Sequence, residues 1–124
     1  MNFVEAIQSG FRNYVGFSGR ARRSEFWYWS LFAFLLSIVA GFIDAAIAPG
    51  SEYGPVTAIM GLALFLPGLA VSIRRLHDLG RSGWYFLLIL IPLIGAIILL
   101  IWFCLRGTVG PNQYGPDPLQ PVTV

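Results

Sequence analysis

The chain has 124 residues, of which 56% are hydrophobic and only 11% are charged, and its formal net charge is +2. This length allows one domain, over residues 1–124. So few charges cannot cover the apolar surface of a water-soluble domain of this size, so the composition predicts an integral membrane protein. The net charge is too small to indicate nucleic-acid binding.

The first element that we expect is a short amphipathic helix within residues 1–17. Its apolar residues recur at helical spacing, at Phe3, Ile7, Phe11 and Tyr14. The segment is too short to cross a membrane, so we expect it to lie along the interface. Gly10 lowers helix stability by about 1 kcal/mol relative to alanine and predicts a bend there.

Three apolar runs follow, over about residues 26–48, 55–73 and 84–105. Each is close to the ~20 residues that a membrane-spanning helix needs, and a helix satisfies its own backbone hydrogen bonds in lipid. We therefore predict an all-α membrane protein with three transmembrane helices and the interfacial helix. Pro55 suits the first position of the second span. The prolines and glycines of residues 107–124 predict an irregular tail.

Asp44 is the one acidic residue inside a predicted span. A charge near the bilayer centre is costly, but Asp44 lies near the outer end of its span. We expect it to contact a neighbouring helix rather than to relay protons.

The arginine positions predict the orientation. Four arginines precede the first span and three lie between the second and third spans, whereas the loop at about 49–54 has no arginine and carries Glu52. The positive-inside rule then places the N-terminus and residues 74–83 in the cytoplasm. Three spans would place the C-terminus outside.

Residues 74–83, RRLHDLGRSG, concentrate the ionisable groups of the second half of the chain. We expect the second span to continue as a helix to Leu79, with Gly80 ending it at a positive φ. Ser82 is then expected to cap the third span.

Two charged clusters should meet at the cytoplasmic side. Arg74 and Arg75 lie four and three residues before Asp78, and Arg22 lies three residues before Glu25, which are spacings that allow pairing on one helix face. The sequence therefore predicts one cytoplasmic layer rich in arginine.

This layer supports two hypotheses. In the first, arginines bind an anionic lipid headgroup or a small anionic ligand, because basic pockets between helices on the cytoplasmic side suit such groups. The candidate ligand residues are Arg22, Arg23, Arg74, Arg75 and Arg81, supported by an ion-pair network of Glu25, His77 and Asp78. In the second, which we favour, the charges are salt bridges and topology signals, and the protein has a structural or interaction role.

Catalysis is the weakest interpretation. His77 and Asp78 are adjacent, so on a helix they point about 100° apart and Asp78 does not orient the imidazole. The single cysteine, Cys104, forms no metal-ligand set, and no nucleophile motif is present. We expect neither an enzyme nor a cofactor or metal. Transport by an oligomer is a further alternative, because Pro67 and Pro92 interrupt two spans.

Three motifs resemble one known family. They are GRARRSEFWYW at 19–29, RRLHDLGRSGWY at 74–85 and GPNQYGPDP at 110–118. Together they are similar to the family called domain of unknown function 805, the YhaH-like proteins, over nearly the whole chain. The resemblance implies a multi-pass helical protein of the bacterial inner membrane and implies no catalytic role. The expected partners are membrane lipids, and a second copy or another membrane protein.

Overall fold

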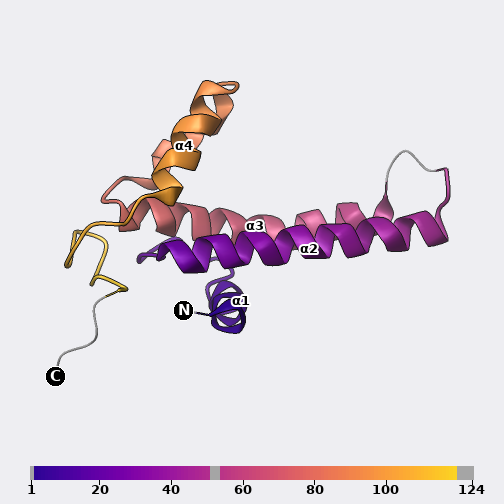
Figure 1. Ribbon diagram of the computed structural model, residues 1–124, viewed down its shortest axis with the longest axis horizontal. Coiled ribbons are helices and arrows are strands. Elements are labelled where there is room, and N and C mark those ends of the chain that lie inside the picture. Colours follow the sequence, from indigo (N-terminus) through magenta and orange to yellow (C-terminus); the bar gives the residue numbers. More distant parts are fainter. Residues whose placement is uncertain (1, 51–53, 120–124) are drawn as a thin grey trace.

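The computed structural model describes residues 2–50 and 54–119, so Glu52 and the last five residues of the predicted tail lie outside the described residues (Figure 1). The regular elements of the described chain are all helical, which confirms the predicted class. They are α1 (Phe3–Arg12), α2 (Arg23–Ile47), α3 (Pro55–Asp78), the 3₁₀ helix η1 (Gly83–Leu90) and α4 (Ile94–Cys104).

Helices α2 and α3 lie side by side and form the long axis of the molecule (Figure 1). They have 25 and 24 residues, which is about 36 Å at 1.5 Å per residue and enough for a hydrocarbon core of ~30 Å. Each has an 18-residue window with a mean hydropathy of 2.2, yet only 11% and 22% of these windows are buried inside the protein. A core helix of a soluble protein would be mostly buried, so these two helices have the length and exposure of membrane spans.

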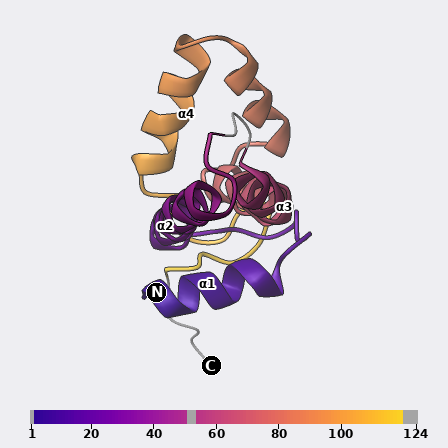
Figure 2. The ribbon, with the colours of Figure 1, turned by 90° about the vertical axis from the view of Figure 1, so that its right-hand side faces the viewer.

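Helix α1 crosses the α2–α3 pair on one side, as Figure 2 shows. It starts with a capping box, in which Glu5 N donates to Asn2 Oδ1 (2.8 Å) and Asn2 N donates to Glu5 Oε1 (3.0 Å). The helix continues through Gly10 to Arg12. The Trp29 indole of α2 packs directly against Gly10. A helix lying across the spans has the direction expected for one in the membrane interface.

Pro67 lies inside α3, and the helix remains continuous around it. Proline has no N–H, so the carbonyl of Ala63, four residues earlier, loses its helical donor. The hydroxyl of Tyr14, which follows α1, donates to this carbonyl. The chain after α1 is thus attached to α3 at a carbonyl that proline leaves without its helical donor.

Asp44 caps the start of α3 from the end of α2. Its carboxylate accepts from Val56 N (2.8 Å), Thr57 N (3.0 Å) and Thr57 Oγ1 (2.7 Å). These are N–H groups that a helix start leaves without internal partners, and the helix dipole favours a negative charge there. The expected contact between Asp44 and a neighbouring helix is confirmed.

The prediction of one continuous helix over residues 84–105 is wrong. Helix η1 ends at Leu90, and α4 runs back beside it, so the two form a hairpin on the side of the α2–α3 pair opposite α1 (Figure 2). Pro92 cannot donate a helical hydrogen bond, and Leu93 has a φ of 65°. A Cβ at Gly95 would lie 1.6 Å from the Leu88 carbonyl oxygen, so only glycine permits the two arms to approach this closely.

Because the hairpin reverses, Cys104 returns to the end of the molecule at which η1 starts (Figure 1). The described tail then lies against the segment that precedes α2, where Arg20 Nη1 donates to the Gly110 carbonyl (2.8 Å). Within residues 107–119 the tail therefore lies at the end of the molecule that holds the start of α2.

Replacing Tyr14 by phenylalanine should destabilise the fold. The Ala63 carbonyl would lose the donor that replaces its missing helical partner, and one such hydrogen bond contributes about 0.5–1.5 kcal/mol. We expect a lower melting temperature for purified Tyr14→Phe in detergent, followed by circular dichroism. Tyr85→Phe is the matched control, because Tyr85 is 47% exposed on the hairpin. Equal melting temperatures for the two variants would contradict this role of Tyr14.

Candidate functional site

The two charged clusters of the sequence meet at the end of the molecule where α2 begins and α3 ends. Ala21 N donates to the Arg74 carbonyl (3.0 Å), which fixes the segment before α2 against α3. We use the term arginine layer for the ionisable side chains that gather here, namely Arg20, Arg22, Arg23, Glu25, Arg74, Arg75, His77, Asp78 and Arg81. A core of buried apolar side chains adjoins the layer, and it includes Phe26, Trp29, Val71, Leu76, Leu99 and Phe103.

Asp78 lies at the centre of the arginine layer. Its Oδ1 accepts from Arg20 Nε (2.9 Å) and its Oδ2 accepts from Arg75 Nη1 (2.7 Å), and all three side chains are at most 2% exposed. The Asp78 carbonyl accepts from Thr108 N (2.6 Å). A Cβ at Gly107 would lie 1.9 Å from Asp78 Oδ2, so glycine is needed where the tail passes over the carboxylate.

Arg20 joins this carboxylate to the tail. Its guanidinium donates to the carbonyls of Thr108 (2.6 Å), Gly110 (2.8 Å) and Gly115 (3.2 Å) as well as to Asp78. A guanidinium offers five N–H donors in a fixed plane, which suits it to several carbonyls at once. Arg20 therefore holds a tail segment that has no helix or strand of its own.

Glu25 links three helices. Its Oε2 accepts from Arg74 Nη1 (2.6 Å) and from Ser9 Oγ (3.1 Å), which joins α2 to α3 and to α1. The expected pairs Arg22–Glu25 and Arg74–Asp78 are replaced by these tertiary partners, and Arg22 donates to the Pro118 carbonyl instead. Two buried atoms of Arg74, Nε and Nη2, have no hydrogen-bond partner among the described residues.

Arg75 and Arg23 hold the end of α4. Arg75 donates to the carbonyls of Phe103 (3.4 Å) and Leu105, and Arg23 Nη1 donates to the Cys104 carbonyl (3.1 Å). The last carbonyls of a helix have no internal donors, and positive charge is favourable beside them. The returning arm of the hairpin is therefore fixed to the start of α2 and the end of α3.

His77 and Arg81 are engaged by aromatic rings. The His77 ring stacks on Tyr114, with centroids 4.0 Å apart, and its Nδ1 lies 2.9 Å from the Gly19 carbonyl oxygen. A carbonyl only accepts, so Nδ1 carries the proton. The Arg81 guanidinium lies over Trp102, 4.1 Å from the ring centroid, which is a cation–π contact.

Burial changes the charge equilibria at the centre of the layer. Burial raises the pKa of the Asp78 carboxyl, although the charges of Arg75 and Arg20 oppose this rise. Burial lowers the pKa of the Arg75 guanidinium. Both directions reflect lost hydration, which the attraction between the charges offsets. Such a pair adds little net stability, but removing one partner costs about 3–5 kcal/mol. The pair therefore specifies which segments come together.

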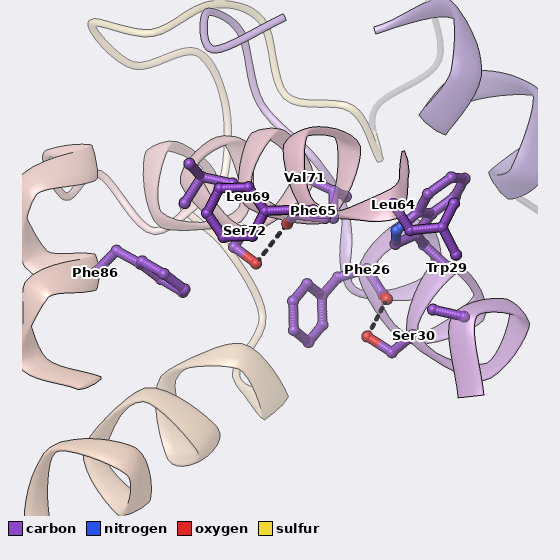
Figure 3. Close-up of a pocket in the computed structure, with 11 residues that line it drawn as sticks. Phe26, Trp29, Ser30, Leu64, Phe65, Leu69, Val71, Ser72 and Phe86 are labelled. Carbon is purple, nitrogen blue, oxygen red and sulfur yellow. Dashed lines mark hydrogen bonds between the residues drawn. The ribbon is translucent and has the colours of Figure 1, made fainter. Parts of the chain in front are cut away.

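A cavity of about 330 Å³ lies between α2 and α3 and is bordered by Phe86 of η1 (Figure 3). Two serine hydroxyls line the cavity, and each donates to a carbonyl of its own helix. Ser30 Oγ donates to the Phe26 carbonyl (2.9 Å) and Ser72 Oγ donates to the Gly68 carbonyl (2.8 Å). No arginine of the layer lines this cavity. Within residues 2–50 and 54–119 no three His, Cys, Asp or Glu side chains gather as a metal site would require.

The sequence reasoning missed the residues that the tail and hairpin contribute. Asn112 Nδ2 donates to the His77 carbonyl (2.9 Å), and Asp117 accepts from Gly110 N (2.9 Å) and from Arg106 (3.4 Å). Asn112 and Asp117, like Tyr114, belong to the motif at 110–118 that carries the family resemblance. That motif was the available signal that the tail has specific contacts.

The chain is similar to known proteins over most of its length. The family model described as "Protein of unknown function (DUF805)" matches residues 14–116. Inner membrane protein YhaH of Escherichia coli (strain K12) is 47% identical over 114 residues, which cover 89% of this chain and 93% of that protein. Inner membrane protein YhaI of the same strain is 47% identical over 107 residues, covering 86% and 89%.

The uncharacterized protein YiiR of that strain is 30% identical over 128 residues, covering 82% of this chain and 84% of its own length. No solved structure matches the chain. The family match covers the first two motifs, residues 110–116 of the third motif and the whole arginine layer. The chain is therefore a member of the DUF805 family.

Proposed function

We propose that this is an inner-membrane protein with a structural or interaction role, in which the arginine layer is an internal latch. The latch holds the hairpin of residues 83–104 and the tail against the α2–α3 pair. The observation that carries this proposal is the sharing of the buried Asp78 carboxylate by Arg20 and Arg75. The same two arginines also bind carbonyls of the tail and of the end of α4. The names of the YhaH and YhaI relatives support the location.

The proposal includes a topology with two complete spans. α2 and α3 cross the membrane, and the positive-inside rule places the arginine layer in the cytoplasm. Each arm of the hairpin is only about 16 Å long, from the rise per residue of 3₁₀ and α helices, and a core of ~30 Å needs more. The hairpin then enters the cytoplasmic leaflet and returns, so both termini are cytoplasmic.

The exposed surface of the hairpin supports this placement and an interaction role. Leu90 and Leu93, near its tip, are each 73% exposed, and Trp84 at its start is 79% exposed. Apolar surface of this extent is covered by lipid or by a partner in a folded protein. The latch sets the position at which this surface enters the membrane.

The ligand-binding alternative is weaker for most of the predicted residues. All five contact groups inside the protein, and Arg23 is the one of the five that is exposed. Catalysis is weaker still, because the Asp78 carboxylate is shared by two arginines and the His77 ring is stacked on Tyr114.

Fusion reporters test the topology. Green fluorescent protein fused after Val124 should fluoresce, and alkaline phosphatase fused there should be inactive, because each reports the compartment in which it folds. The control is alkaline phosphatase inserted after Gly50, in the turn between α2 and α3, which should be active. Active alkaline phosphatase after Val124 would contradict two complete spans and would restore three.

Acid should release the tail. Hydrogen bonds from Leu119 N and then from Gly110 N lower the pKa of the Asp117 carboxyl below its ordinary value of about 3.9. A carboxyl whose pKa is lowered by folding stabilises the folded state above its unfolded pKa, and this contribution is lost as the pH falls through the lowered value. Tail docking should therefore be constant down to about pH 4 and should weaken below it.

The measurement for Asp117 is amide NMR of Gly110 and Leu119 during an acid titration. Asp117→Asn keeps the shape of the side chain but has no acid to titrate, so its tail signals should not show this step. An identical step in the variant and in the natural protein would assign the transition to another group.

A further inference from the structure

We propose that a cavity between the start of α2 and the end of α4 binds the phosphate of an anionic phospholipid. The cavity has a volume of about 370 Å³ and is lined by Arg23, Ser24, Trp27, Tyr28 and Cys104. This ligand goes beyond the structural role proposed above, because it would bind the side of the exposed Arg23 guanidinium that does not face the Cys104 carbonyl.

The charge distribution favours an anion at this end of the molecule. Seven of the eight arginines of the chain lie in the arginine layer or at the start of the tail, and the eighth, Arg12, ends α1. Only four acidic residues accompany them, namely Glu5, Glu25, Asp78 and Asp117. The internal ion pairs therefore leave an excess of positive charge, which attracts anionic lipid at a membrane surface.

Arg23 is the predicted ligand residue that lines this cavity. Its side chain is exposed, and its Nη1 donates to the Cys104 carbonyl. The remaining edge of the guanidinium can meet two phosphate oxygens in the paired geometry that arginine favours. Burial lowers the pKa of Arg75, and the charge of Arg23 lowers it further. An anion bound to Arg23 would relieve this repulsion.

The other walls fit the region where a lipid headgroup meets its chains. Ser24 also lines the cavity, as do Trp27 and Tyr28, which are each 37% exposed. Aromatic rings of this kind favour the headgroup level of a bilayer. The Trp27 indole N–H donates to the Phe103 carbonyl (3.1 Å), which fixes this ring as a wall.

An apolar stripe leads from the cavity toward the middle of α2. Trp27, Leu31 and Leu35 are four residues apart and so share one face of the helix. Leu31 and Leu35 are each 45% exposed. The order of cation, aromatic ring and leucines along α2 matches the order of phosphate, glycerol and acyl chain in a phospholipid.

Native mass spectrometry of the full chain tests the proposal, with phosphatidylglycerol and phosphatidylcholine offered at equal concentration in detergent. We expect one phosphatidylglycerol to be retained in preference. Arg23→Gln should weaken its binding at least about tenfold, because it removes the charge that would meet the phosphate. Arg12→Gln is the matched control, because Arg12 is also an exposed arginine but does not line the cavity. It should retain the lipid.

A second variant and a soluble probe separate a lipid from a free ion. Leu35→Gln changes the stripe and leaves the latch intact, so it should weaken phosphatidylglycerol binding even if Arg23→Gln folds poorly. Inorganic phosphate at millimolar concentration should not displace the lipid, because it gains nothing from the stripe. Equal weakening in Arg12→Gln and Arg23→Gln, unchanged binding in both Arg23→Gln and Leu35→Gln, or displacement by inorganic phosphate would each overturn the proposal.

Discussion

The buried carboxylate of Asp78 is the interaction on which the rest of this structure depends. Arg20 approaches it from the segment before α2, and Arg75 approaches it from the last turn of α3. The three side chains are at most 2% exposed, so solvent cannot replace a missing partner. If the carboxylate were removed, two buried cations would face each other, and this is the costly outcome for a buried ion pair.

The same two arginines extend this constraint to segments that are distant in the sequence. Arg20 also donates to carbonyls of the tail, and Arg75 also donates to carbonyls at the end of α4. A short apolar hairpin gains little by packing on other helices in lipid, where hydrophobic burial no longer drives association. Its position must then be set by polar contacts at its ends. The arginine layer supplies these contacts at the level where the hairpin begins and returns.

The sequence predicted the features that have a local physical cause. Pro55 starts α3, Gly80 follows its end with a φ of 77°, and Ser82 caps η1 by accepting from Trp84 N. The first two spans followed from hydropathy and length. The third did not, because residues 84–105 are apolar whether they cross a bilayer or turn back within it. The turn depends on Pro92 and on the close approach at Gly95, to which a hydropathy average is insensitive.

The ion pairs of the layer were only partly predictable for a related reason. Spacing along a helix identifies local partners, and the Arg75–Asp78 pair is of that kind. Glu25 instead pairs with Arg74 across two helices, and Arg20 binds backbone carbonyls, which every residue has and which leave no mark in the sequence. Tertiary geometry therefore determines which arginines form internal ion pairs, and it leaves Arg23 exposed beside a cavity.

Hydrogen–deuterium exchange in Asp78→Asn tests the central claim most directly. If the shared carboxylate holds the hairpin and the tail, removing its charge should cost about 3–5 kcal/mol of stability at these contacts. Exchange across residues 104–117 should then rise by about a hundredfold or more, while the middle of α2 and α3 stays protected. Asp44→Asn, at the other end of the molecule, should leave residues 104–117 unchanged. Unchanged protection of residues 104–117 in Asp78→Asn would contradict the account.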